Sequence, residues 1–188
     1  MPIYFAYGSN LHPTRLIERV GAVTILGTAR LEGHTLSFDK RGGDGSGKCH
    51  LNPAPAGSFV LGALFELTTA QFRGLDQFEG RGFGYERESL RVEAAAGPIK
   101  VESYLAMPAH REAGLQPFDW YRALVWVGAR LHRFDAAYCA RIAATPSRPD
   151  ADARRSARWL NFARDLAGAE GLPDDGAPNP IGRAGRID

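Results

Sequence analysis

The sequence has few of the residues that mark disulfide-rich, zinc-binding or membrane-spanning proteins. Its 188 residues include 2 cysteines, Cys49 and Cys139, and neither lies in a CxxC pair or a Cys/His cluster. They therefore predict neither a disulfide framework nor a zinc site. No apolar run approaches the roughly 20 residues needed to cross a bilayer, and residues 1–7 lack the basic start and cleavage site of a signal peptide. We expect a cytoplasmic protein with no membrane partner.

Motifs for covalent or metal-assisted catalysis are also missing. The 5 histidines show no HxxxH or HExxH spacing, and the chain has no GxSxG elbow for a serine nucleophile. Cys49 and His50 are neighbours, but adjacent side chains on an extended segment point apart, which disfavours a Cys/His mechanism. The sequence predicts no bound metal and no cofactor.

The charge balance gives little support to a nucleic-acid partner. The 23 Lys and Arg residues are interleaved with 21 Asp and Glu residues, for a formal net charge of +2. Arg154, Arg155, Arg158 and Arg164 surround Trp159, but at this spacing they more often form the solvated face of a helix. We expect no nucleic-acid partner.

The segment RGGDGSGKCH, residues 41–50, has the GxxxxGK spacing of a phosphate-binding loop between Gly42 and Lys48. Its context argues against that function. Cys49 stands where such a loop needs Ser or Thr, and the proline that follows in residues 51–53 cannot readily open a helix. We expect a flexible loop.

The order of predicted elements indicates the fold class. Thr68 with Gln71 has the form of a capping box, and Phe72, Leu75 and Phe78 follow one helical stripe that Gly80 ends. Strands come first and helices follow, which is typical of an α+β fold with a mainly antiparallel sheet or a small β-barrel flanked by helices. We expect one domain over residues 1–170 and a flexible tail over 171–188, which is rich in Gly and Pro. The predicted strands are 2–7, two runs within 22–38, 58–67, 84–95 and 99–107, and the predicted helices are 13–20, 68–79, 118–132, 135–144 and 151–168.

The first predicted strand stops abruptly at Gly8, Ser9 and Asn10. A glycine at a strand-to-helix turn lets the backbone approach a ligand, and unpaired N–H groups at the start of a helix attract an anion or a polarised carbonyl. Ser9 and Asn10 could instead serve only as a helix cap and a turn residue. The residues alone leave both interpretations open.

Glu79 ends an amphipathic helix and is followed by the glycine-rich segment 80–85. A carboxylate there meets the unfavourable end of the helix dipole, and an apolar setting would add desolvation, so we expect a raised pKa that suits a proton shuttle. A solvated surface glutamate is the alternative. Tyr85, Tyr104 and Tyr121 could each offer a hydroxyl to a ligand or serve only in packing.

Taken together, these residues resemble the γ-glutamylcyclotransferase family, whose first strand ends in YGSN-L and whose helix-borne Glu precedes a glycine-rich turn. The sequence has YFAYGSNL at residues 4–11 and LDQFEG at 75–80. The resemblance extends from about residue 3 to 144. The YGSN form is more similar to the enzymes that act on γ-glutamyl amino acids than to the glutathione-specific or γ-glutamylamine branches. Other segments that fit are 29–38, 60–65, 103–105 and 120–129.

The resemblance implies a γ-glutamylcyclotransferase fold and an enzyme that closes the α-amine of its substrate onto the γ-carbonyl. The products are 5-oxoproline and the released amino acid or amine, and the partner is a small γ-glutamyl compound. Glu79 is the implied catalytic residue, acting as general base and then as general acid. The implied substrate-binding residues are Tyr7, Gly8, Ser9, Asn10, Leu11, Tyr85 and Tyr121.

Two other functions stay open. One is the same cyclisation on a different donor, such as a γ-glutamylamine or an antibiotic intermediate. The other is a ligand-binding or interaction module without turnover, although a pure binder has no need of a proton shuttle such as Glu79. The sequence leaves the oligomeric state undetermined, and a homodimer is compatible with it.

Overall fold

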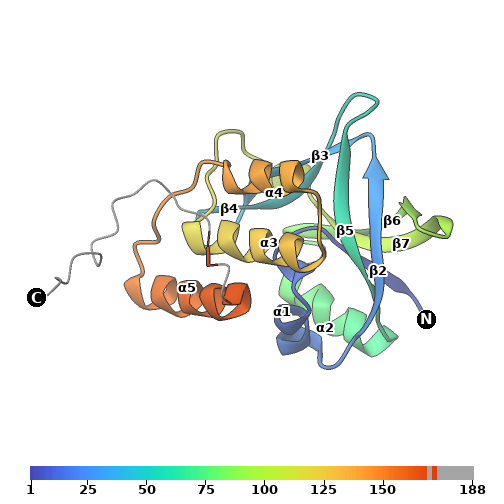
Figure 1. The fold of residues 1–188 in the computed structure, drawn as a ribbon, viewed down its shortest axis with the longest axis horizontal. Helices are drawn as coiled ribbons and strands as arrows, with labels where there is room; N and C mark the ends of the chain where they lie inside the picture. Colours follow the sequence, from blue (N-terminus) through green and yellow to red (C-terminus); the bar gives the residue numbers. More distant parts are fainter. Residues whose placement is uncertain (169–170, 173–188) are drawn as a thin grey trace, which may run out of the picture.

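The computed structural model describes residues 1–168 and 171–172, and its centre is a closed five-stranded β-barrel (Figure 1). Neighbouring strands are antiparallel, except that β1 and β7 pair in parallel through Tyr4 and Glu102 and so close the barrel. The predicted α+β class with a small barrel is confirmed. The strands follow one another around the barrel as β1 (Ile3–Ala6), β5 (Phe59–Glu66), β2 (Thr24–Glu32), β6 (Tyr85–Ala94) and β7 (Gly97–Ala106).

A separate hairpin, β3 (His34–Arg41) and β4 (Gly47–Pro53), corrects the prediction of a flexible loop over residues 41–50. The backbone N–H of Gly42 donates to the Ser46 carbonyl at 2.8 Å and tightens the turn. Gly47 begins β4 so close to Phe38 that an added Cβ would lie 2.0 Å from the Phe38 carbonyl oxygen. A glycine is therefore required where the chain enters β4.

The helices cover one side and one end of the barrel. In Figure 1, α3 lies between α4 and α5, while α1 and α2 lie together below the strands. Among the described residues, none of the helices is long and apolar enough to cross a membrane. The helices are η1 (Ser9–Leu11), α1 (Pro13–Val20), α2 (Thr69–Glu79), η2 (Pro108–His110), α3 (Asp119–Leu131), α4 (Ala136–Ala143) and α5 (Ala153–Ala167).

Helix α2 begins and ends where its sequence predicts. Thr68 and Gln71 form both hydrogen bonds of a capping box, and Gly80 ends the helix in the left-handed conformation with φ 63°. The predicted apolar stripe is wrong at its last position, because Phe78 is 59% exposed while Phe72 and Leu75 are buried. Phe78 lies in the last turn, where the Arg19 guanidinium lies 5.5 Å from the centre of its ring.

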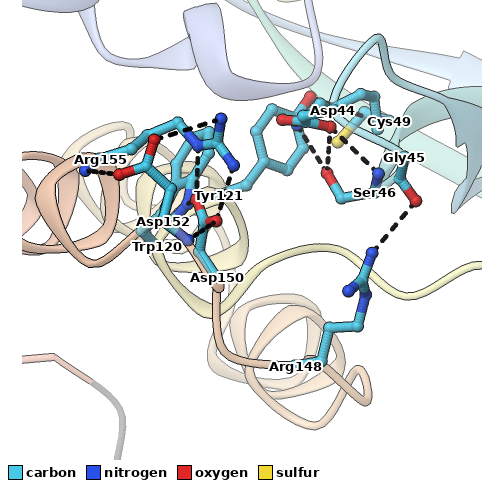
Figure 2. A network of polar contacts seen from close by, with 11 residues as sticks. Asp44, Gly45, Ser46, Cys49, Trp120, Tyr121, Arg148, Asp150, Asp152 and Arg155 are labelled. Atoms are coloured by element: carbon cyan, nitrogen blue, oxygen red, sulfur yellow. Dashed lines mark hydrogen bonds and ion pairs between the residues drawn. The ribbon is translucent and has the colours of Figure 1, made fainter.

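Helix α5 is held against α3 by a polar and aromatic cluster (Figure 2). The Trp120 indole N–H donates to the Asp150 carboxylate at 2.9 Å, and Arg155 binds the same carboxylate through Nε and Nη2 at 2.5 and 2.7 Å. The hydrogen bonds from Arg155 hold the pKa of Asp150 well below its usual value. Trp159 stacks on Trp120 with ring centroids 5.8 Å apart. Part of the arginine-rich segment therefore serves internal packing.

The tail predicted for residues 171–188 lies outside the described residues, apart from 171–172.

Candidate active site

A pocket opens where the first strand turns into the first helix. It encloses about 300 Å³ of space unfilled by atoms, including its open mouth. The 7–10 segment, which we call the YGSN loop, forms one wall, and the end of α2 brings a carboxylate to the other. The lining residues are Tyr4, Tyr7, Gly8, Ser9, Asn10, Cys49, Glu79, Tyr85, Tyr104 and Tyr121.

Gly8 lets the YGSN loop pass close to β4. A Cβ on Gly8 would lie 3.0 Å from the Cys49 Cβ and 3.6 Å from the Tyr121 hydroxyl, so a larger residue would push the loop away. The Leu11 backbone N–H donates to the Gly8 carbonyl at 2.9 Å, which closes η1. The N-cap of α1 is His12, whose Nδ1 accepts a hydrogen bond from the Thr14 N–H at 3.3 Å. The helix-cap interpretation of Ser9 and Asn10 is therefore wrong, and both residues lie in the pocket wall.

The Asn10 side chain joins the YGSN loop to the catalytic candidate. Its Nδ2 donates to Glu79 Oε1 at 3.0 Å and to the Tyr4 hydroxyl at 3.1 Å. Asn10 is 4% exposed, and its Oδ1 has no hydrogen-bond partner among the described residues. Buried carbonyl oxygens normally accept a hydrogen bond. The amide therefore fixes the carboxylate with one end and keeps an acceptor available at the other.

Glu79 is held from α1 as well as from the loop. Arg19 Nη1 donates to Glu79 Oε1 at 2.8 Å, and the two side chains are 20% and 16% exposed. The apolar setting expected for Glu79 is thus corrected to a polar one, with two donors on the same oxygen. Glu79 is neither a solvated surface residue nor remote from the N-terminal loop.

The buried tyrosine hydroxyls form different hydrogen bonds with the backbone. Tyr7 donates to the Tyr104 carbonyl, and Tyr85 donates to the Cys49 carbonyl at 2.7 Å. The Tyr121 hydroxyl instead accepts from the Cys49 N–H at 3.2 Å. Burial raises the pKa of Tyr7, Tyr85 and Tyr121 well above the usual value, so all three stay protonated.

Leu11 lies outside the residues that line the pocket. Its side chain is fully buried, and its carbonyl oxygen is 2.7 Å from His132 Nε2. A Cβ on Gly128 of α3 would lie 2.5 Å from the Leu11 Cβ, which shows how tightly α3 backs the YGSN loop. Leu11 thus anchors the loop to the core.

Cys49 and His50 do not form a nucleophile–base pair. Burial raises the pKa of the Cys49 thiol to about 12, which keeps it protonated and poorly nucleophilic. The His50 ring points to β7, where its Nδ1 accepts from the Ala106 N–H at 3.1 Å. Burial lowers the pKa of His50 to about 4. The two side chains lie on opposite sides of β4, in agreement with the sequence argument.

Sequence reasoning missed several groups around the pocket. Tyr4 and Cys49 line it, while Arg19 and Lys40 place cations near Glu79. Tyr104 was considered only as a packing or ligand residue, and its hydroxyl donates to Asp76 at 2.7 Å. Tyr4 is the first tyrosine of the YFAY segment that leads into the YGSN loop, a position that could have indicated it, but the other contacts join elements far apart in the chain.

A larger cavity of about 740 Å³, measured in the same way, lies between the hairpin and α4. Among its described lining residues, Arg141 is the charged one, and it offers no carboxylate to move a proton. Chemistry therefore favours the smaller pocket at Glu79 as the active site. The lining residues of the larger cavity are Thr35, Leu36, Phe38, Gly57, Ser58, Phe59, Tyr138, Arg141, Ile142 and Thr145.

Comparisons with known proteins bear on the family and on the fold. Residues 4–123 match the family model described as "Gamma-glutamyl cyclotransferase, AIG2-like". A solved structure named "Gamma-glutamyl cyclotransferase" superimposes with a TM-score of 0.77 at 23% identity, covering 87% of this chain and 98% of its own. The solved structure of an uncharacterized protein from Homo sapiens superimposes with a TM-score of 0.75 at 24% identity, covering 86% of this chain and 96% of its own. A search of curated proteins found no significant match.

A third solved structure, YkqA from Bacillus subtilis, matches with a TM-score of 0.65 at 22% identity over 78% of this chain. The match covers 56% of the YkqA chain. At these identities the structural likeness establishes the fold.

Proposed function

Because the chain belongs to the gamma-glutamyl cyclotransferase, AIG2-like family, we propose that it cyclises the γ-glutamyl group of a γ-glutamyl amino acid or amine. The products are 5-oxoproline and the free amino acid or amine. The observation that carries this proposal is the Glu79 carboxylate, held by Asn10 of the YGSN loop at 3.0 Å inside a tyrosine-lined pocket. A proton-transferring group and a substrate-binding loop thus meet at one place.

The reaction needs no protein nucleophile, because the substrate carries both reacting groups. Its α-amine attacks its own γ-carbonyl carbon, the C–N bond to the leaving amine breaks, and a five-membered lactam remains. Holding such a chain in a near-attack conformation is equivalent to an effective concentration of about 10⁵ M or more. The pocket walls from the YGSN loop and the buried tyrosines supply this constraint.

Two proton transfers complete the reaction. The α-ammonium must lose a proton before it attacks, and the leaving nitrogen must gain one as its bond to carbon breaks. Glu79 can perform both transfers in turn. Such general acid–base catalysis accelerates a reaction by a factor of roughly 10² to 10⁴. The buried Oδ1 of Asn10 can accept a hydrogen bond from the same ammonium and hold it beside the carboxylate. Backbone N–H groups of the YGSN loop are the donors proposed for the tetrahedral oxygen.

Replacing Glu79 by Gln tests this assignment. Glu79→Gln keeps the size and hydrogen-bonding shape of the side chain but cannot accept the proton, so we expect kcat to fall by roughly 10² or more. Release of 5-oxoproline from γ-glutamyl-alanine, γ-glutamyl-ε-lysine and glutathione is the measurement. The matched control is Glu88→Gln, the same change at an exposed position of β6, which should leave turnover intact.

The outcomes separate the competing functions. Near wild-type turnover by purified Glu79→Gln would overturn the catalytic assignment. Tight binding of a γ-glutamyl compound by the wild type with no product over long incubation would indicate a non-catalytic binding module. The cytoplasmic location, the lack of a nucleic-acid partner and the homodimer remain predictions.

A further inference from the structure

The larger cavity between the hairpin and α4 takes no part in the proposed reaction. Its walls come from β3 and β5 on one side and from α4 on the other, in the upper part of Figure 1. It encloses about 740 Å³, against about 300 Å³ for the pocket at Glu79. The two share none of their described lining residues. The larger cavity is therefore a separate place for a ligand.

The walls of this cavity are largely apolar and aromatic. The rings of Phe59 and Tyr138 stack with their centroids 6.2 Å apart and an angle of 20° between their planes. Tyr138 is fixed in place because its hydroxyl accepts from the Leu61 N–H at 3.2 Å. Apolar walls left in contact with water forgo the free energy that burial would provide, and such surfaces mark sites where ligands or partners bind. The apolar part of a ligand would cover these rings.

Helix α4 brings one cation to the same cavity. Arg141 follows Tyr138 by one helical turn, and its guanidinium lies 5.0 Å from the centre of the Tyr138 ring and 5.8 Å from that of Phe59. Within residues 1–168 and 171–172, the Arg141 side chain forms no ion pair and no hydrogen bond. Arg141 is exposed, so this cation lies at the mouth of the cavity rather than at its floor.

A second arginine shows which partner Arg141 lacks. The Arg30 guanidinium lies 3.7 Å over the Phe59 ring and binds the Glu32 carboxylate at 2.5 Å. Arg141 approaches the same ring, but none of the described lining residues of the cavity is acidic. A guanidinium binds a planar carboxylate through two parallel hydrogen bonds. A carboxylate brought by a ligand would give Arg141 the partner that Glu32 gives Arg30.

We infer that this cavity binds a small carboxylic acid with an aromatic or aliphatic body. The carboxylate would bind Arg141, and the body would lie against Phe59 and Tyr138. A single lining cation suits a monoanion better than a doubly charged phosphate, and it disfavours a cationic ligand. The Phe38 ring separates this site from the pocket at Glu79, because it packs edge-on against Tyr121 with centroids 6.3 Å apart. The inference goes beyond the proposed function and does not depend on it.

The test measures binding directly, by isothermal titration calorimetry at pH 7. The probes are 3-phenylpropionate and hexanoate, each compared with its neutral primary amide, which differs from the acid in one group. We expect the wild type to bind each acid at least fivefold more tightly than its amide. The preference is modest because the ion pair would form at an exposed arginine.

Two variants separate the charge from the space. Arg141→Met removes the cation but keeps much of the apolar stem, so it should reduce the preference to less than twofold while the amide binds as before. Thr35→Trp fills the cavity from an exposed position of β3 and should weaken acid and amide alike. The matched control is Arg158→Met, which removes another exposed arginine 5.0 Å from a ring centre, that of Trp159 on α5. It should keep the preference.

Arg19→Met tests whether the acids bind instead in the pocket at Glu79, since it removes the cation that contacts this carboxylate. We expect it to bind the acids as the wild type does; a loss equal to that of Arg141→Met would overturn the inference. Equal binding of acid and amide by the wild type, or no detectable binding of either acid, would also overturn it. Arg141 and Thr35 are both exposed, so both variants should fold, which thermal melting checks. Release of 5-oxoproline is not measured, so failure of the proposed function would leave these outcomes unchanged.

Discussion

The fully buried imidazole of His50 should make the fold sensitive to mild acid. Its Nδ1 accepts from the Ala106 N–H, and its Nε2 has no partner among the described residues. Protonating Nδ1 would break that hydrogen bond and place a charge in the core. Burial accordingly lowers the pKa of His50 from 6.5 to about 4, with Arg111 adding to the effect.

The sign of the pH dependence follows from proton binding. Between pH 6.5 and 4 the unfolded chain protonates His50 and the folded chain does not, so lowering the pH favours unfolding. The contribution of neutral His50 to the free energy of unfolding is fully present above pH 6.5 and is lost by about pH 4. Each pH unit of this interval changes the free energy of unfolding by about 1.4 kcal/mol, so the whole interval changes it by about 3 kcal/mol. Lowering the pH from 7 to 5 covers part of the interval and costs about 2 kcal/mol.

The variant His50→Asn isolates this effect, because its amide oxygen can still accept from the Ala106 N–H but does not titrate. Urea unfolding followed by tryptophan fluorescence at pH 7 and pH 5 gives the free energy of unfolding of both proteins. We expect the wild type to lose about 2 kcal/mol more than the variant over this interval. Contributions of other groups, including His12, cancel in the comparison. An equal loss in the two proteins would refute the reasoning, and far-UV circular dichroism at pH 7 controls for the fold.

Two further substitutions test how the pocket is supported. Gly128→Ala would place a Cβ 2.5 Å from the Leu11 Cβ and 2.9 Å from the His12 backbone nitrogen, so we expect a loss of about 1–3 kcal/mol of stability and lowered turnover. An unchanged melting temperature with unchanged turnover would contradict the close packing of α3 on the YGSN loop. Tyr121→Phe removes the hydroxyl that accepts from the buried Cys49 N–H, which should lower the free energy of unfolding, measured in urea, by about 1–3 kcal/mol. Unaltered stability with unaltered KM would leave Tyr121 with a packing role alone.

Most elements of the fold were predictable because their signals are local. The capping box of α2, Gly80 at its end and the turn between β6 and β7 depend on residues a few positions apart. Strand β4 was missed because its sequence, GKCHLNP, begins and ends with residues typical of loops. It forms a strand by pairing with β3 and by burying Cys49, His50 and Leu51, and neither interaction is visible in the segment itself.

The candidate site was predictable in its parts but not in its contacts. Glu79 and the YGSN loop stand out through resemblance to a family, yet nothing in the sequence indicates that Asn10 donates to Glu79 across 69 positions. The same holds for Arg19, which lies on a helix whose cations could equally face solvent. The expected apolar setting of Glu79 is wrong for this reason, since its polar partners come from α1 and the YGSN loop rather than from α2.

The parallel pairing that closes the barrel has a consequence for how the protein is made. Tyr4 meets Glu102 of β7, and Tyr7 donates to the carbonyl of Tyr104, so the first strand finds its second neighbour only after about a hundred further residues have been synthesised. Until then, a chain emerging from the ribosome carries the YGSN loop and Glu79 without the wall that holds them. The loop therefore gains its support from α3, which packs against Leu11, only once that helix has left the exit tunnel.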